Sequence, residues 1–237
     1  YDRRALSMRS GRLDFMNLLR SAEQLLYEVV SWLVFYPLTL WRCLKHPLAM
    51  IGYAESELRK PPEAQFQDAL SPPIFLFLTL VLVHLIQAGV FHQSVVLSGV
   101  LGDTRNLLVF RAVSFSLFPM LLGLQHVRLA GQRLSRETLR PMFYAQCYVT
   151  VPAVLALDVA LMLGHSPARW SYAAAWTVFA VGLLWYAGAL MRGFMDHRGI
   201  SWGRALRQTA LALVLGSTSF VIAMLLSLLS GPLPADL

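Results

Sequence analysis

Two side chains of opposite charge stand inside apolar stretches of the sequence, where ionised groups are costly and often functional. Arg111 comes shortly after the start of one apolar segment, and Asp158 comes shortly before the end of the next. Consecutive helices running in opposite directions would bring these positions to the same depth, where each charge stabilises the other. We therefore predict a buried Arg111–Asp158 pair. It is either a gate or proton-coupled site, or a strut between two helices; Arg111 could instead extend to the membrane surface.

Five uncharged polar side chains in the apolar segments are further candidates. His84 stands near the middle of its segment, with Gln87 one helical turn later. The imidazole is either a proton relay or a side chain that is hydrogen-bonded to a neighbouring helix. Gln125, His126 and Gln146 share the other end of the two segments that hold Arg111 and Asp158. We predict that these three form an interhelical hydrogen-bond cluster.

Signatures of familiar enzymes are missing from the sequence. It contains no phosphate-binding Gly-rich loop, no GxSxG or HExxH motif, and no paired carboxylates in an apolar segment. The histidines lie at different depths, without the spacing of metal ligands. We therefore expect a non-enzymatic protein that binds no metal and no cofactor.

The elements that carry these residues are apolar enough for a membrane. The chain is 57% hydrophobic and 14% charged, whereas soluble domains carry about 25% charged residues. Five unbroken segments have about the 20 residues that a membrane-spanning helix needs. They are residues 73–97, 107–130, 141–164, 170–191 and 206–229. The prediction is an all-α integral membrane fold: an N-terminal region at 1–72, a five-helix bundle at 73–230, and a short tail at 231–237.

Arginines in alternate loops predict the orientation. Two loops hold Arg128, Arg133, Arg136, Arg140, Arg192, Arg198, Arg204 and Arg207. The positive-inside rule places these loops and the N-terminus in the cytoplasm, and the C-terminus outside. The net charge of +7 is explained in this way, so we expect no nucleic-acid partner. The composition is typical of a bacterial inner-membrane protein.

The N-terminal region contains an amphipathic helix. Apolar residues recur every three or four positions over residues 14–31, with polar residues on the other face. The apolar run that follows, at 29–41, is short for a span and is interrupted by Pro37. The helix lies either at the cytoplasmic interface, which we adopt, or against the bundle or a second copy. A further short helix is predicted at 48–59.

Small residues indicate where helices approach closely. The segment at 141–164 carries Ala156, Ala160 and Gly164 at four-residue spacing, and the next segment carries Gly182 and Gly188. These two helices are predicted to form the centre of the bundle or an interface between copies.

The organisation resembles the Yip1-domain family of five-span membrane proteins. In that family an acidic, Leu- and Pro-containing segment leads into the first span, and Asp68, Leu70 and Pro72 are the comparable residues. The Tyr-Gly step of the family is absent, because Ser71 and Pro72 stand there. The chain also resembles bacterial permease-like proteins. The Yip1 resemblance implies an oligomerising, non-enzymatic scaffold that binds other proteins, and it transfers no catalytic residue.

Three functions compete at this stage. The first is a scaffold or subunit of a membrane complex, with membrane lipids, a second copy or other membrane proteins as partners. The second is a small-solute or ion transporter or channel that uses Arg111, Asp158 and His84 along a polar path. The third is a lipid-modifying enzyme, for which the cytoplasmic acidic residues lack an ordered spacing.

Overall fold

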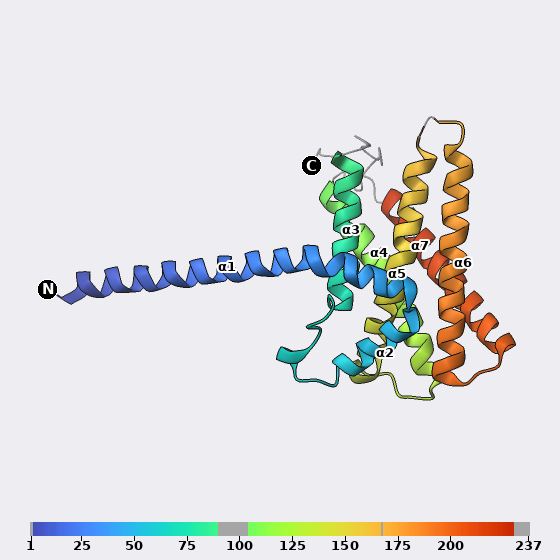
Figure 1. Ribbon diagram of the computed structural model, residues 1–237, viewed down its shortest axis with the longest axis horizontal. Helices are drawn as coiled ribbons and strands as arrows, with labels where there is room; N and C mark the ends of the chain where they lie inside the picture. The colour runs from blue at the N-terminus through green and yellow to red at the C-terminus, as the bar shows by residue number, and fades with distance from the viewer. Residues whose placement is uncertain (1, 90–103, 167, 230–237) are drawn as a thin grey trace.

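The computed structural model describes residues 2–89, 104–166 and 168–229, and this part of the chain is helical without a β-strand. The all-α fold class is therefore confirmed. The elements, labelled in Figure 1, are α1 (Asp2–Lys45), α2 (Pro47–Glu57), the 3₁₀-helix η1 (Pro62–Ala64), α3 (Pro72–Gly89), α4 (Thr104–Leu129), α5 (Arg136–Gly164), α6 (Ser171–Arg198) and α7 (Trp202–Leu229).

Four of these helices, α4 to α7, are long and apolar enough to cross a membrane. They match the predicted segments at 107–130, 141–164, 170–191 and 206–229. α3 is apolar but shorter, and the predicted first span at 73–97 continues into residues outside the described ranges. The count of five spans therefore stays a prediction. The predicted tail at 231–237 also lies outside the described part of the chain.

α5 forms the centre of the bundle. It contacts α1, α2, α3, α4 and α6, whereas α7 packs against α4 and α6. Consecutive residues of α5, from Ala145 to Pro152, are buried. A helix that is buried all round in this way fixes the positions of its neighbours.

The predicted close approach of α5 and α6 is present at one point above all. A Cβ atom added to Gly182 would lie 2.3 Å from the Cβ of Ala156, so only glycine fits there. Gly164 lies near Ala175 at the outer end of α5, and Ala160 is buried.

One of the predicted packing glycines does not pack. No atom of the described residues lies within 4 Å of a Cβ at Gly188, which faces a cleft and not a helix. The small-residue pattern also missed a second close approach. A Cβ at Gly216 of α7 would lie 2.4 Å from the ring of Phe118 in α4.

α1 continues through Pro37 as one helix, whereas the sequence predicts an interruption there. Tertiary contacts beside the proline compensate for the missing backbone N–H. The Tyr36 hydroxyl is hydrogen-bonded to that of Thr79 in α3 at 3.1 Å. The Thr39 hydroxyl donates to the Phe35 carbonyl and accepts a hydrogen bond from the backbone N–H of Leu70. The C-terminal part of α1 is thus fixed to the bundle.

The rest of α1 leaves the bundle crosswise to α5 and α6 (Figure 1). Between residues 25 and 34 its large apolar side chains are at least half exposed, except Trp32, which packs against the bundle. The C-terminal part of α1 therefore packs against the bundle, and the placement of the projecting part at the cytoplasmic interface stays a prediction.

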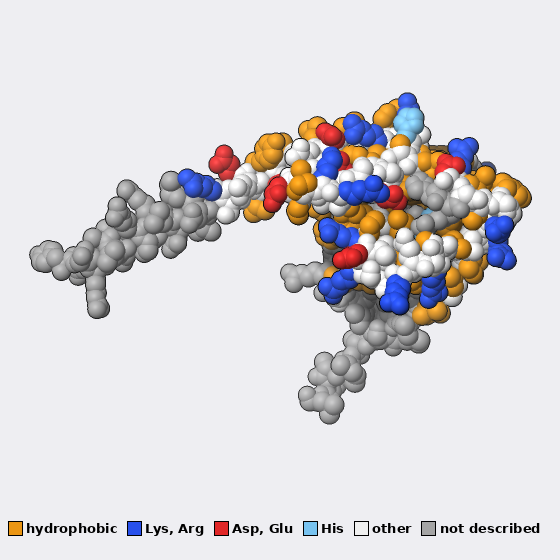
Figure 2. Space-filling view, turned by 90° about the horizontal axis from the view of Figure 1, so that it is seen from below, with side chains coloured by type: hydrophobic (Ala, Val, Ile, Leu, Met, Phe, Trp, Pro, Cys, Tyr) orange, Lys and Arg blue, Asp and Glu red, His pale blue; other side chains and the backbone are white. Residues whose placement is uncertain are grey.

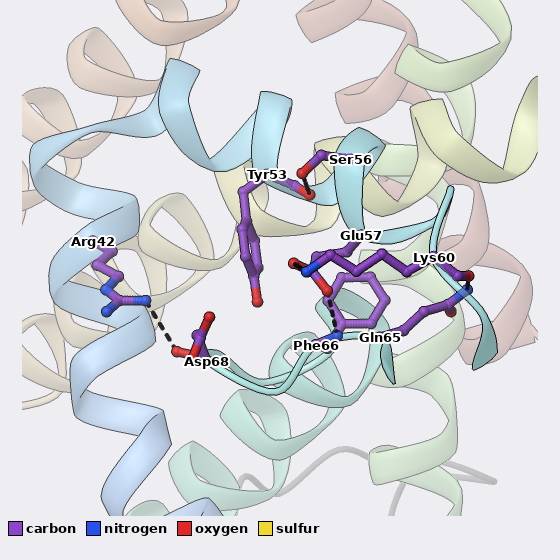
Figure 3. Close-up of polar contacts among 8 residues, drawn as sticks. All are labelled: Arg42, Tyr53, Ser56, Glu57, Lys60, Gln65, Phe66 and Asp68. Carbon is purple, nitrogen blue, oxygen red and sulfur yellow. Dashed lines mark hydrogen bonds and ion pairs between the residues drawn. The ribbon is translucent and has the colours of Figure 1, made fainter. Parts of the chain in front are cut away.

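The predicted short helix at 48–59 is present as α2, and a buried carboxylate fixes the loop that follows (Figure 3). Glu57 is 2% exposed and accepts hydrogen bonds from the Lys60 ammonium at 2.6 Å and from the backbone N–H of Phe66 at 2.8 Å. The second contact holds Phe66 at its unusual positive φ of 54°. Arg42 of α1 donates to the carbonyl of Asp68 and ties the same loop to α1.

The arginine-rich loops lie together. The α4–α5 and α6–α7 connections are at the same end of the bundle as α2 and η1, and we call this the inner end (Figure 1). Figure 2 views the molecule from this end and shows Lys and Arg side chains spread over it. We call the opposite end, where the α5–α6 connection lies, the outer end.

Candidate intramembrane polar site

The two predicted charges meet near the outer end of the bundle. Arg111 of α4 forms an ion pair with Asp158 of α5, and the two residues are 8% and 1% exposed. The Arg111 guanidinium also donates a hydrogen bond to the side-chain oxygen of Gln87 in α3 at 2.7 Å. We call these three residues the outer cluster. It links three helices through one guanidinium, and the attraction between its charges offsets part of the cost of removing them from water.

The outer cluster leaves one acceptor without a partner. Asp158 Oδ2 is buried and makes no hydrogen bond to any residue that the structure describes. His84, one turn before Gln87, is only partly buried and is close enough to Arg111 to interact with its charge. A carboxylate with a vacant oxygen can accept a proton or a hydrogen-bond donor. The positive charge of Arg111 and the negative charge of Asp158 neutralise each other within the cluster.

The predicted cluster of Gln125, His126 and Gln146 forms only in part. The side chains of His126 and Gln146 lie 3.3 Å apart, and the imidazole stacks on the ring of Phe194 in α6. Gln125 does not join them. Its amide donates to the side-chain oxygen of Gln208 in α7 at 2.6 Å. Neighbouring residues on a helix point about 100° apart, so Gln125 and His126 face different partners.

Two further buried hydrogen bonds were not predicted. The Tyr148 hydroxyl of α5 donates to the Leu70 carbonyl at 2.6 Å, just before α3 begins. The hydroxyls of Thr150 and Tyr186 lie 3.3 Å apart between α5 and α6. The sequence does contain a signal for these bonds. Tyr148, Thr150 and Tyr186 carry hydroxyls within predicted spans, and a buried hydroxyl needs a hydrogen-bond partner.

The fold and its polar contacts define a class: an all-helical protein with four helices long and apolar enough to cross a membrane, whose buried polar groups mostly bind one another across helices. Among the described residues, His, Cys, Asp and Glu form no group of three that could hold a metal ion. Comparisons with known proteins find no matching family model, no matching curated protein and no matching solved structure. The resemblance to the Yip1-domain family therefore stays a prediction.

Proposed function

We propose that this chain is a non-enzymatic membrane protein that serves as a scaffold or subunit of a membrane complex. The observation that carries the proposal is the projecting part of α1. Leu26 is 68% exposed and Leu33 is 73% exposed, although an isolated protein gains by covering such side chains. A helix that carries an uncovered apolar face away from its own bundle is suited to hold a membrane surface or another subunit.

The apolar face of α1 points in the direction expected of a helix that lies on the membrane surface. Glu28 and Ser31 line a groove together with Gln65 of the inner-end loop, so this side of α1 faces the inner end. Helical geometry places Leu26 and Leu33 on the roughly opposite side, toward the level of the spans. This is the arrangement of an interfacial helix, with its polar face in water and its apolar face in lipid.

The length of α5 also supports a position of α1 at the inner surface of the membrane. Its 29 residues extend about 43 Å, which exceeds the roughly 30 Å hydrocarbon core of a bilayer. The inner turns of α5, α2 and the arginine loops can therefore stand in the cytoplasm below α1.

The proposal includes a first span through α3, an N-terminus in the cytoplasm, a C-terminus outside and a bacterial inner membrane.

Purification in a mild detergent, followed by mass measurement of the intact assembly, tests the scaffold function. We expect a stoichiometric partner protein or a defined homo-oligomer. Replacing Leu26, Val30 and Leu33 by Gln should weaken the assembly formed in the membrane, because without its apolar face α1 no longer lies on the membrane surface. The matched control replaces Gln24 and Glu28 on the polar face by Ala. A chain that remains single under all conditions would refute the proposal.

A small-solute or ion transporter is the second candidate, and the vacant Asp158 Oδ2 favours it. A proton or donor group that binds there could be released at the outer side. Flux of protons and of small ions into liposomes, measured with the native chain and with Asp158→Asn, distinguishes the two functions. The scaffold proposal predicts no flux above that of empty liposomes. Flux that disappears in Asp158→Asn would establish transport instead.

A further inference from the structure

A cleft of about 560 Å³ opens beside the turn between α1 and α2. Its size falls within the range of roughly 300–1,000 Å³ that is usual for small-molecule sites. One wall is apolar and belongs to α6, where Leu184, Trp185 and Gly188 line it. At Gly188 this wall is open, because the residue has no side chain and a Cβ there would meet no atom within 4 Å.

The rim of this cleft is basic. Lys45 and His46 from the α1–α2 turn and Arg192 from α6 line it, and neither Asp nor Glu does. All three side chains are exposed, and the side chains of His46 and Arg192 form no hydrogen bond or ion pair with another described residue. Lys45 lies over the ring of Trp41, at 4.3 Å from its centroid, a contact that leaves its ammonium hydrogens available. The positive charge at this rim is therefore not neutralised by any of the residues that the structure describes.

The depth of the cleft matches the lipid headgroups. About 20 residues of helix cross the hydrocarbon core, and counted from Ser171 they end just before Arg192. The apolar wall continues into the outward face of α6, where Leu184 is 72% exposed and Val181 is 62% exposed. An occupant must therefore combine a negative group at the rim with an apolar chain along α6.

We propose that this cleft binds an anionic phospholipid of the inner leaflet. Its phosphate lies between Lys45, His46 and Arg192, and one acyl chain runs along α6 past Gly188. The charge complementarity and the adjoining apolar wall select a lipid over an acidic protein segment, which would leave the apolar wall uncovered. The first turn of α2 adds a smaller favourable contribution, because the partial positive charge of a helix N-terminus lies there. The proposal rests on the proposed orientation, with the inner end at the cytoplasmic leaflet, but it does not depend on the scaffold function.

Native mass spectrometry of the full chain in a neutral detergent tests the site, with dioleoyl phosphatidylglycerol and dioleoyl phosphatidylcholine as probes. We expect retained phosphatidylglycerol and much weaker retention of phosphatidylcholine. Each Lys or Arg near a membrane surface strengthens anionic binding about fivefold, so Lys45→Gln with Arg192→Gln should weaken it about 25-fold. The control pair is Arg204→Gln with Arg207→Gln, which removes the same charge at exposed positions of the same end. An equal loss in the control would overturn the site.

Filling the cleft tests the acyl-chain wall separately. Gly188→Leu should abolish retention, whereas Gly52→Leu should not, since neither position has a neighbour within 4 Å. Equal melting temperatures of the native chain and both variants will verify folding. Retention unaffected by Gly188→Leu, or displacement of the lipid by millimolar inorganic phosphate, would contradict the proposal. A loss of dimers in Gly188→Leu without a loss of lipid would assign the cleft to a second copy, and would also overturn it.

Discussion

Charged side chains are buried and paired at one end of the bundle, and exposed beside a cleft at the other. At the outer end, Arg111 and Asp158 are buried and bind each other. At the inner end, Lys45 and Arg192 are exposed beside a cleft and have no acidic partner there. Buried ions must be paired because lipid and protein solvate them poorly, whereas cations at the headgroup level can be solvated by lipid phosphates. The outer cluster therefore links helices to one another, whereas the exposed inner charges fit the proposed contact with lipid phosphates.

Breaking the outer pair should have the largest effect on stability. Arg111→Met or Asp158→Leu alone leaves one uncompensated buried charge, and we expect a loss of about 3–5 kcal/mol in the free energy of unfolding. The double variant should recover most of this loss because no charge remains. Thermal unfolding in detergent is the measurement. Single and double variants of equal stability would mean that the two charges do not act as a pair.

The α5–α6 contact provides the next comparison, between two glycines of one helix. Gly182→Ala should cost about 1–3 kcal/mol through overlap with Ala156, while Gly188→Ala should be neutral or stabilising by up to about 1 kcal/mol. Adding Ala156→Gly to the first variant should restore stability, because it vacates the overlapping position. These values come from the same unfolding assay. A similar response of both glycines would contradict the described packing.

Tyr148 tests whether the inner half of the core is as firmly fixed as the outer cluster. Tyr148→Phe removes the hydroxyl that donates to the Leu70 carbonyl, and we expect a loss of about 1 kcal/mol. Tyr172→Phe is the control, since its side chain is 65% exposed. Denaturant unfolding monitored by circular dichroism measures both. No difference between them would show that this hydrogen bond contributes nothing to stability.

At neutral pH the smallest expected effect is that of a titratable group at the inner end, because its contribution changes only above about pH 10. Burial, and then the negative charge of Glu57, raise the pKa of Tyr53 to about 12. Because the pKa of Tyr53 is about 10 in an unfolded chain, the neutral phenol stabilises the fold below pH 10. This contribution should be lost as the pH rises from about 10 to 12. Absorbance titration of the native chain against Tyr53→Phe measures the ionisation. An ionisation of Tyr53 near pH 10 would contradict the described burial.

The sequence predicted those features that depend on local pattern or depth. α4 to α7 are continuous apolar runs, and the Arg111–Asp158 pair followed from matching depths on consecutive helices. The role of Gln87 did not follow, because the rotation of α3 about its axis is a tertiary property. For the same reason, the pairing of Gln125 with Gln208 could not be seen.

Two other features depend on contacts between distant parts of the chain. Local propensity predicts an interruption of α1 at Pro37, whereas packing of Tyr36 and Thr39 on α3 and its preceding loop keeps the helix continuous. Arg192 is far in sequence from Lys45, and only the turn between α1 and α2 brings them to one cleft. Hydrophobic periodicity does not predict that two residues so far apart in the sequence lie beside the same cleft.

The environment of α1 tests the central claim, that an interfacial helix extends from this bundle over the inner membrane surface. Spin labels at Leu33→Cys and Glu28→Cys, read by electron paramagnetic resonance in liposomes, report contact with lipid-soluble oxygen or with a water-soluble nickel reagent. The native Cys43 and Cys147 are both buried, which limits their labelling. The account predicts lipid contact at residue 33 and water contact at residue 28. Water contact at both positions would contradict it.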